Sequence, residues 1–353
     1  MNLQEILKGA VEKEASDIFI IAAQPVSYKI NGMIEKQNDI VLYREEIEAL
    51  INEMYAYAGN RDISHRKDGD DDFALSVPNV GRFRVNVYQQ RGSWSAVLRV
   101  VSFELPDVAS MNIPETVLDL SKKQKGLVLV TGSAGSGKST TISYIINEIN
   151  TNRNCHILTL EDPIEYLHKH KKSIVSQREI SIDSVDYSRA LKAAMRESPD
   201  VILIGEMRDL ETIETAMTAA ETGHLVLSTL HTIGAANTID RIVDVFPANQ
   251  QQQIRIQLSM VLKAVVSQQL LPTVDGDLVP AFEVMKANSA IKTLIRDGKV
   301  HQLDSAIFSS GREGMMTMDS SILQLYKNGR ISEQTALSYC LNADSMKRSL
   351  SVR

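Results

Sequence analysis

The sequence predicts an α/β protein in which a small mixed domain precedes a doubly wound, mostly parallel sheet. Two observations support this prediction. From residue 116 onward, apolar runs alternate with helical segments, a pattern typical of sheets built from strand–helix–strand units. The chain also has 353 residues, which exceeds the usual size of one domain and favours two.

The first third has the pattern of a compact α/β domain. Apolar residues recur at helical spacing over 3–11, and a second amphipathic segment covers 45–57. Asn31-Gly32 predicts a hairpin turn between two short strands. Residues 68–72, which include four aspartates, are expected to form an acidic loop; a solvated turn is favoured over a metal site there. The further predicted strands are 17–22, 73–77, 81–88 and 94–101.

The domain boundary is predicted at residues 105–115, which contain two prolines and no clear period. This gives an N-terminal domain of 1–104 and a larger domain of 116–353, whose final part, from about residue 288, is helical. The predicted strands of the larger domain are nearly all apolar, as expected for parallel strands that are buried on both faces. They are 126–131, 157–161, 201–206 and 225–230.

Composition excludes several classes of protein. The 43% hydrophobic and 23% charged residues exclude a disordered chain. Lys and Arg number 38 against 44 Asp and Glu, and this net charge of −6 argues against a dedicated nucleic-acid binder. No run approaches ~18 apolar residues, so no membrane span is expected, and the N-terminus lacks the apolar core of a signal peptide. Cys155 and Cys340 form no C-x-x-C pair, which indicates a reducing compartment and no structural zinc.

One motif predicts phosphate binding. Residues 132–139 match G-x-x-x-x-G-K-[ST], with an apolar strand before them and a helix after them. The glycines let backbone N–H groups face an anion, and the helix N-terminus adds partial positive charge. Lys138 is expected to reach the β- and γ-phosphates and Ser139 to bind Mg²⁺. A merely structural glycine-rich turn is the alternative. The predicted nucleotide-binding residues are Gly132, Ser133, Ala134, Gly135, Ser136, Gly137, Lys138, Ser139 and Thr140.

Acidic residues follow two neighbouring predicted strands. Glu161, Asp162 and Glu165 follow one strand, and Glu206 ends another. Strand C-termini line the ligand crevice of an open α/β sheet, so we expect these carboxylates near the phosphates. Taken singly, each of these acids is as compatible with a position in a surface loop as with a position at the phosphates. A generic Walker B motif has Asp before its Glu, and Gly205 occupies that position here.

Two histidines flank the last predicted strand of the core, His224 at its start and His231 at its end. From chemistry alone, a hydrogen-bonded structural histidine is the favoured interpretation of each. Metal ligation is disfavoured, because no Cys or second His lies at ligand spacing.

Together these motifs resemble the secretion ATPase superfamily, and within it the PilT-type pilus-retraction ATPases, over essentially the whole chain. Residues 159–166 (T-L-E-D-P-I-E-Y) resemble the Asp box, and 195–209 resemble the atypical Walker B, in which Gly before Glu is normal. Residues 220–232 resemble the His box. Residues 290–297 (A-I-K-T-L-I-R-D) are similar to the C-terminal retraction motif A-I-R-N-L-I-R-E. An ordinary amphipathic helix is the alternative for that last segment.

The resemblance implies a PAS-like N-terminal domain, a RecA-like core and a ring of six chains that hydrolyse ATP with Mg²⁺. Glu165 would be the general base, Glu206 and Ser139 would hold Mg²⁺, and His231, supported by His224, would sense the γ-phosphate or bridge to a neighbouring subunit. Glu161 and Asp162 would lie at the nucleotide. The candidate arginine fingers are Arg82, Arg84 and Arg99, with Arg208 and Arg241 as weaker candidates.

The function implied is a motor that retracts type IV pili in twitching motility, at the cytoplasmic face of the inner membrane. Its partners would be a membrane platform protein and pilin, without direct nucleic-acid binding. Assembly-type relatives typically carry a four-cysteine zinc insertion, which two cysteines cannot supply. A pilus or type II secretion assembly ATPase, a RecA- or helicase-like nucleic-acid motor and a nucleotide-gated scaffold are the alternatives.

Overall fold

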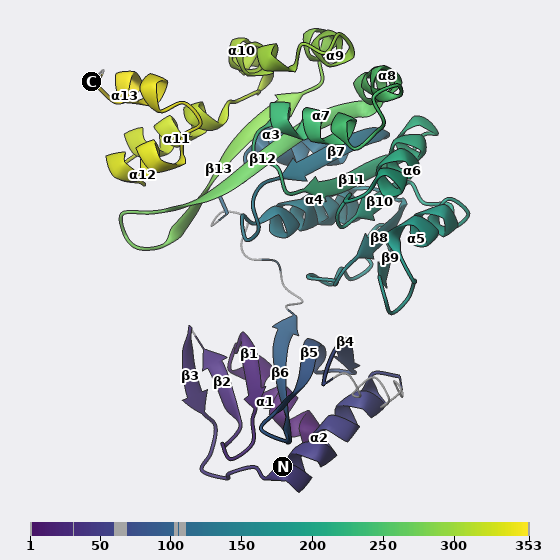
Figure 1. Cartoon of the computed structure of the whole chain (residues 1–353), viewed down its shortest axis with the longest axis vertical. Helices are drawn as coiled ribbons and strands as arrows, with labels where there is room; N and C mark the ends of the chain where they lie inside the picture. Colours follow the sequence, from purple (N-terminus) through teal and green to yellow (C-terminus); the bar gives the residue numbers. More distant parts are fainter. Residues whose placement is uncertain (1, 31, 60–68, 102–104, 106–110, 352–353) are drawn as a thin grey trace. The chain divides into compact units, whose positions relative to one another are not determined.

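The computed structural model describes residues 2–30, 32–59, 69–101, 105 and 111–351. The chain divides into two compact units, residues 1–104 with 165–167 and residues 105–164 with 168–353. Residues 106–110 of the predicted linker lie outside the described residues. The elements of each unit are labelled in Figure 1.

In its described residues, the first unit is an antiparallel sheet with two helices against it (Figure 1). In the described residues the strand order is β3-β2-β1-β6-β5-β4. The core is formed by the apolar face of the sheet and by one stripe of each helix, with Leu3, Ile6 and Phe83 fully buried. The elements are α1 (Leu3–Glu12), β1 (Asp17–Ile20), β2 (Ser27–Ile30), β3 (Met33–Lys36), α2 (Arg44–Tyr57), β4 (Asp70–Val77), β5 (Gly81–Gln90) and β6 (Ser93–Val101).

The expected acidic loop is wrong for Asp70, Asp71 and Asp72, which form the start of β4. Asp71 pairs with Val87 of β5 and is only 8% exposed. Its carboxylate accepts a hydrogen bond of 2.9 Å from the Tyr55 hydroxyl of α2. A polar partner at a buried position therefore allows an aspartate to continue the strand.

The second unit is a sheet with strand order β13-β12-β7-β11-β10-β8-β9 among the described residues. Its strands run parallel apart from β13, which pairs antiparallel with β12. The strands are β7 (Gly126–Thr131), β8 (His156–Glu161), β9 (Ile174–Glu179), β10 (Val201–Ile204), β11 (Leu225–Leu230), β12 (Leu262–Pro272) and β13 (Leu278–Lys286). The sequence prediction omitted β9, β12 and β13.

Helices cover both faces of this sheet, because alternate residues of each strand point to opposite sides. Leu127 and Leu129 pack on the side of α5 to α10, whereas Val128 and Val130 pack on the side of α3 and α4. The helices are α3 (Glu115–Leu118), α4 (Lys138–Asn152), α5 (Tyr187–Ala194), α6 (Leu210–Glu221), α7 (Ala235–Asp244), α8 (Gln251–Val261), α9 (Ser289–Arg296) and α10 (Leu303–Ser309).

The C-terminal helices form a smaller cluster on the extended hairpin of β12 and β13 (Figure 1). They are α11 (Met318–Lys327), α12 (Glu333–Tyr339) and α13 (Ala343–Ser351), and short 3₁₀ turns cover Asp119–Lys122, Val300–Gln302 and Gly311–Glu313. Met318, Ile322 and Met346 bury their side chains against Leu271 and Val279. The helical C-terminal part therefore packs on strands that themselves belong to the central sheet.

Candidate nucleotide site

The phosphate-binding loop joins the end of β7 to the start of α4. Gly137, the residue before the helix, has a φ of +86°, which is open to glycine at little cost. A Cβ there would lie 2.8 Å from the side-chain amide nitrogen of Gln268 on β12. Ser133, Ala134 and Gly135 are exposed at the tip of the loop. The loop thus packs against β12 on one side, and its tip is open to solvent. A phosphate would bind there to the backbone N–H groups and the N-terminus of α4.

Lys138 lies inside this loop and is only 7% exposed. Its ammonium group donates hydrogen bonds to the carbonyl oxygens of Gly132 at 2.9 Å and Ser133 at 2.8 Å. Ser139 and Thr140 follow on the first turn of α4 and are half-buried. The P-loop residues predicted from sequence therefore form one continuous local structure.

His231 connects the P-loop to the acidic residue of the Walker B-like segment. Its Nδ1 lies 3.4 Å from Lys138 Nζ, and its Nε2 lies 3.4 Å from Glu206 Oε1. An ammonium group only donates, so Nδ1 faces it as acceptor and Nε2 carries the proton toward the carboxylate. The other oxygen of Glu206 lies 2.8 Å from an Arg208 guanidinium nitrogen. Lys138, His231, Glu206 and Arg208 therefore form a continuous polar row across the ends of β7, β11 and β10.

The other predicted acids follow β8. Glu161 accepts hydrogen bonds from the Thr159 hydroxyl at 2.6 Å and the Gln177 amide at 3.2 Å. Asp162 is exposed. Glu165 is also exposed, but it groups with the first unit, so its role toward a phosphate stays a prediction.

Tyr187, the first residue of α5, was not predicted to belong to the site. Burial raises the pKa of its phenol well above the ordinary value, and the charges of Asp162, Glu161 and Glu206 raise it further, in that order. The hydroxyl therefore keeps its proton beside three carboxylates from two strand ends. No sequence motif marks this residue, because its place depends on how α5 packs against β8 and β10.

Gly205 has a steric reason to be glycine. A Cβ at this position would lie 2.8 Å from the Tyr187 hydroxyl oxygen and 3.3 Å from the Leu160 carbonyl oxygen. A contact of 2.8 Å is closer than carbon and oxygen tolerate without movement. The departure from the generic Walker B motif is thus coupled to a tyrosine elsewhere in the sequence.

The remaining candidates lie in other surroundings. The Nδ1 of His224 lies 2.9 Å from the Ala219 carbonyl oxygen at the end of α6, which is a structural hydrogen bond. Arg84 and Arg99 face each other across β5 and β6 in the first unit, and Arg99 pairs with Asp17 at 3.0 Å. Arg82 donates to the Ser76 hydroxyl at 3.2 Å. The arginine-finger role of these three residues stays a prediction, and Arg241, in the last turn of α7, stays one as well.

The donor set suits Mg²⁺ better than a softer metal. Ser139 offers a hydroxyl and Glu206 a carboxylate, the hard oxygen ligands that Mg²⁺ accepts alongside substrate phosphates. In the described part of the chain, no group of three or more His, Cys, Asp or Glu is placed to hold a metal. A resident all-protein metal centre is therefore not found among these residues, whereas a nucleotide-borne Mg²⁺ fits.

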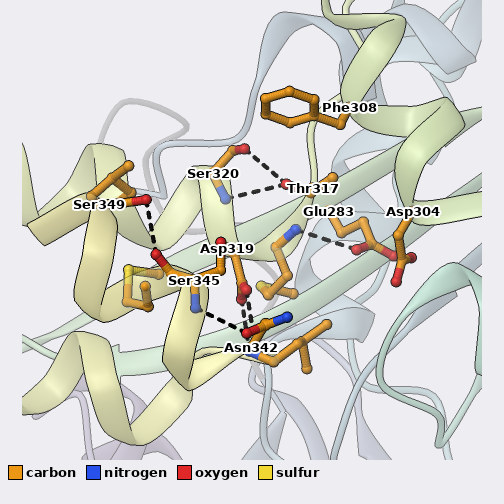
Figure 2. A pocket seen from close by; sticks show the side chains of 13 residues that line it. Glu283, Asp304, Phe308, Thr317, Asp319, Ser320, Asn342, Ser345 and Ser349 are labelled. Carbon is orange, nitrogen blue, oxygen red and sulfur yellow. Dashed lines mark hydrogen bonds between the residues drawn. The ribbon is translucent and has the colours of Figure 1, made fainter.

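A separate cavity of about 460 Å³ lies among β13, α10, α11 and α13 (Figure 2). On its wall Glu283, 1% exposed, accepts hydrogen bonds from the N–H groups of Ala235 at 2.6 Å and Met318 at 3.2 Å. Burial raises its pKa, although these hydrogen bonds act in the opposite direction. Asp319 accepts from the N–H groups of Leu341 and Asn342, at 2.7 and 3.0 Å. Glu283 therefore holds the start of α11 to β13. Asp319 of α11 holds the segment between α12 and α13.

The match to known proteins is nearly full-length. The family model described as type II/IV secretion system protein matches residues 1–335. The chain belongs to this family. It is 42% identical over 336 residues to the type IV pilus retractation ATPase PilT of Pseudomonas aeruginosa, covering 95% of this chain and 97% of that protein. It is 47% identical over 346 residues to a twitching motility protein of Neisseria gonorrhoeae, covering 98% and 92%.

A solved structure extends the likeness to three dimensions. The crystal structure of the pilus retraction motor PilT with bound ADP matches with a TM-score of 0.89 and 45% identity, covering 99% of both chains. The predicted fold class, a RecA-like core with a smaller N-terminal domain, is confirmed, and so is the resemblance to the secretion ATPase superfamily. The chain is a nucleotide-binding ATPase of this superfamily. Among the described residues, no helix has the length and apolar character that a membrane crossing requires.

Proposed function

We propose that this protein is a hexameric, ATP-driven motor that powers type IV pilus retraction in twitching motility. The observation that carries the proposal is the row formed by Lys138, His231 and Glu206 at the P-loop. It occurs in a chain that matches proteins named for pilus retraction over nearly their whole length. A cytoplasmic location, at the inner membrane through a platform protein that contacts pilin, belongs to the same proposal.

The residues divide the chemistry among them. The P-loop N–H groups and the N-terminus of α4 bind the phosphate oxygens, and Lys138 adds a positive charge beside them. Ser139 and Glu206 would hold Mg²⁺, which neutralises phosphate charge when it is bound. Glu165 would accept the proton of the attacking water. His231, whose side chain is 47% exposed, is accessible to the γ-phosphate while it contacts Lys138 and Glu206.

The two-unit organisation supports a mechanical role. Residues 105–115 would act as the hinge between an N-terminal domain and the ATPase domain, with Arg82, Arg84 or Arg99 reaching a phosphate in the closed state. Nucleotide contacts would favour closure, and product release would permit opening. Sequential closure around a ring would move the pilus base, and the segment around α9 would transmit that motion.

Hydrolysis is tested first. The purified protein should hydrolyse ATP in the presence of Mg²⁺, and Lys138→Ala and Glu206→Ala should each reduce turnover by at least about 100-fold, the scale of a lost charge stabiliser. A wild-type protein without ATPase activity would contradict the proposal, and so would a Lys138→Ala variant that binds ATP as the wild type does.

Direction is tested in cells. Deletion of the gene should leave surface pili present or in excess and abolish twitching, because pili are then assembled and not withdrawn. Loss of pili would instead indicate an assembly motor. DNA-stimulated turnover that weakens steeply with salt would indicate a nucleic-acid motor.

A further inference from the structure

The hydroxyl of Tyr187 fills the space that a side chain at position 205 would need. The close approach to a Cβ on Gly205 places the phenol oxygen directly over the end of β10. The same Cβ would lie 3.3 Å from the Leu160 carbonyl oxygen and 3.4 Å from Glu161 Cα, at the end of β8. The hydroxyl therefore lies where the two neighbouring strands end.

These strand ends carry like charges. β8 and β10 are parallel neighbours, with Leu160 opposite Ile204. Glu161 and Asp162 follow Leu160 in the sequence. Glu206 follows Ile204, with Gly205 between them. Carboxylates on adjacent strand ends repel one another, and a neutral O–H donor near them reduces that repulsion.

A generic Walker B segment has an aspartate at the position that Gly205 occupies in this chain. This chain therefore lacks a carboxylate at that position. Gly205 supplies no side chain, and the space it leaves receives a hydroxyl from α5. A hydroxyl donates a hydrogen bond, whereas an ionised carboxylate only accepts. The substitution thus replaces an acceptor by a donor at a site otherwise rich in acceptors.

We propose that the Tyr187 hydroxyl is a positioning group for ATP hydrolysis. In this role its single O–H donates to one carboxylate at the ends of β8 and β10 and so keeps Glu206 aligned with His231 and Lys138. This inference rests on the proposed ATPase activity and assigns to that reaction a residue outside its sequence motifs. Tyr187 acts through Glu206 and is not itself a catalytic residue.

The test of this role is Tyr187→Phe, which removes one oxygen and keeps the ring. We expect kcat to fall about tenfold, equivalent to about 1.4 kcal/mol. KM for ATP should stay within about twofold, and so should the affinity for a fluorescent ADP analogue without Mg²⁺, because P-loop contacts are untouched. A kcat equal to that of the wild type would overturn the inference. An inactive wild type would instead overturn the proposed function on which it rests.

A second measurement, independent of turnover, tests the contact. Gly205→Ala should lower the melting temperature in the wild-type background and lower it less in a Tyr187→Phe background, since the clash involves the hydroxyl. Equal losses in the two backgrounds would show that the hydroxyl does not occupy this space.

The chain offers a matched control. In the first unit, a Cβ on Gly9 would lie 3.0 Å from the Tyr28 hydroxyl, which donates to the Ile6 carbonyl at 2.6 Å. Gly9→Ala and Tyr28→Phe should show the same kind of thermal coupling and leave kcat unchanged. A Tyr28→Phe variant that slows turnover as much as Tyr187→Phe would overturn the assignment, because loss of any buried hydroxyl would then suffice.

Discussion

A single imidazole, that of His231, joins the phosphate-binding lysine to the Walker B-like glutamate. It contacts Lys138 Nζ and Glu206 Oε1, each at 3.4 Å. Because β11 pairs in register with β7 and β10, residues that follow its end lie beside residues that follow theirs. The sequence predicted a structural histidine or a phosphate sensor. In the structure, the side chain contacts both Lys138 and Glu206.

Replacing His231 by alanine should slow turnover while the nucleotide still binds. We expect kcat to fall by about 10-fold or more, since one charge-assisted hydrogen-bond network is lost. Steady-state ATPase assays and ADP titration measure the two effects. His156→Ala is the control: its ring bonds Glu197 and Ser176 at the opposite end of β8, so stability should fall and kcat should not. Unchanged turnover in His231→Ala would contradict the role.

Thr141 and Gln268 form a buried pair beneath the P-loop. The threonine hydroxyl donates to Gln268 Oε1 at 2.7 Å, and both residues are fully buried. Thr141→Val should lower the free energy of unfolding by about 1–3 kcal/mol, because it leaves a buried acceptor unsatisfied. Urea unfolding measures this. Thr218→Val, at an exposed position of α6, should change stability by less than about 0.5 kcal/mol. Equal losses in the two variants would contradict the role of the buried pair.

At the scale of elements, strands were predictable where they are apolar and flanked by clear breaks. β7, β8, β10 and β11 met these conditions. β12 did not, because Ser267 and Gln268 interrupt its apolar run, although both are fully buried and bonded to Gly234 and Thr141. β9 is a polar edge strand. Tyr187 was missed for a related reason: its role arises from packing between elements, which no local pattern records.

The cavity lined by Glu283, Asp304 and Asp319 makes the stability of the folded state depend on pH. Burial and the charge of Asp319 raise the pKa of Asp304 above its ordinary value. The folded state therefore holds this proton to a higher pH than the unfolded chain, and stability is lost as pH rises through the folded pKa. Asp304→Asn should raise the melting temperature at pH 8 and leave it unchanged near pH 3, where the acid is protonated in both states. Thermal scans across pH check this, and a lower melting temperature at pH 8 would contradict it.

At the scale of the whole molecule, the chain has separate hydrophobic cores. The cluster around Phe83 and Leu3 lies within the first unit. The clusters on the two faces of the second sheet, and the one under α11 to α13, lie within the second unit. Each unit therefore buries its own apolar surface, as a domain able to fold alone does.

Calorimetry without nucleotide should accordingly resolve two unfolding transitions. Phe83→Ala should destabilise the first unit by about 3–5 kcal/mol, the usual cost of emptying a core position. It should shift one transition and leave the midpoint of the other in place. Leu227→Ala, in the fully buried centre of β11, should shift only the other. A single transition that moves with both substitutions would show that the cores unfold as one.

The contact between Gly205 and Tyr187 also constrains how this sequence can evolve. While tyrosine occupies position 187, any side chain at 205 meets its hydroxyl, so glycine is retained. Once phenylalanine occupies 187, a small residue at 205 becomes tolerable. Substitutions at these two positions are therefore expected in one historical order, with loss of the hydroxyl first. Lineages that carry a side chain at 205 should lack the tyrosine.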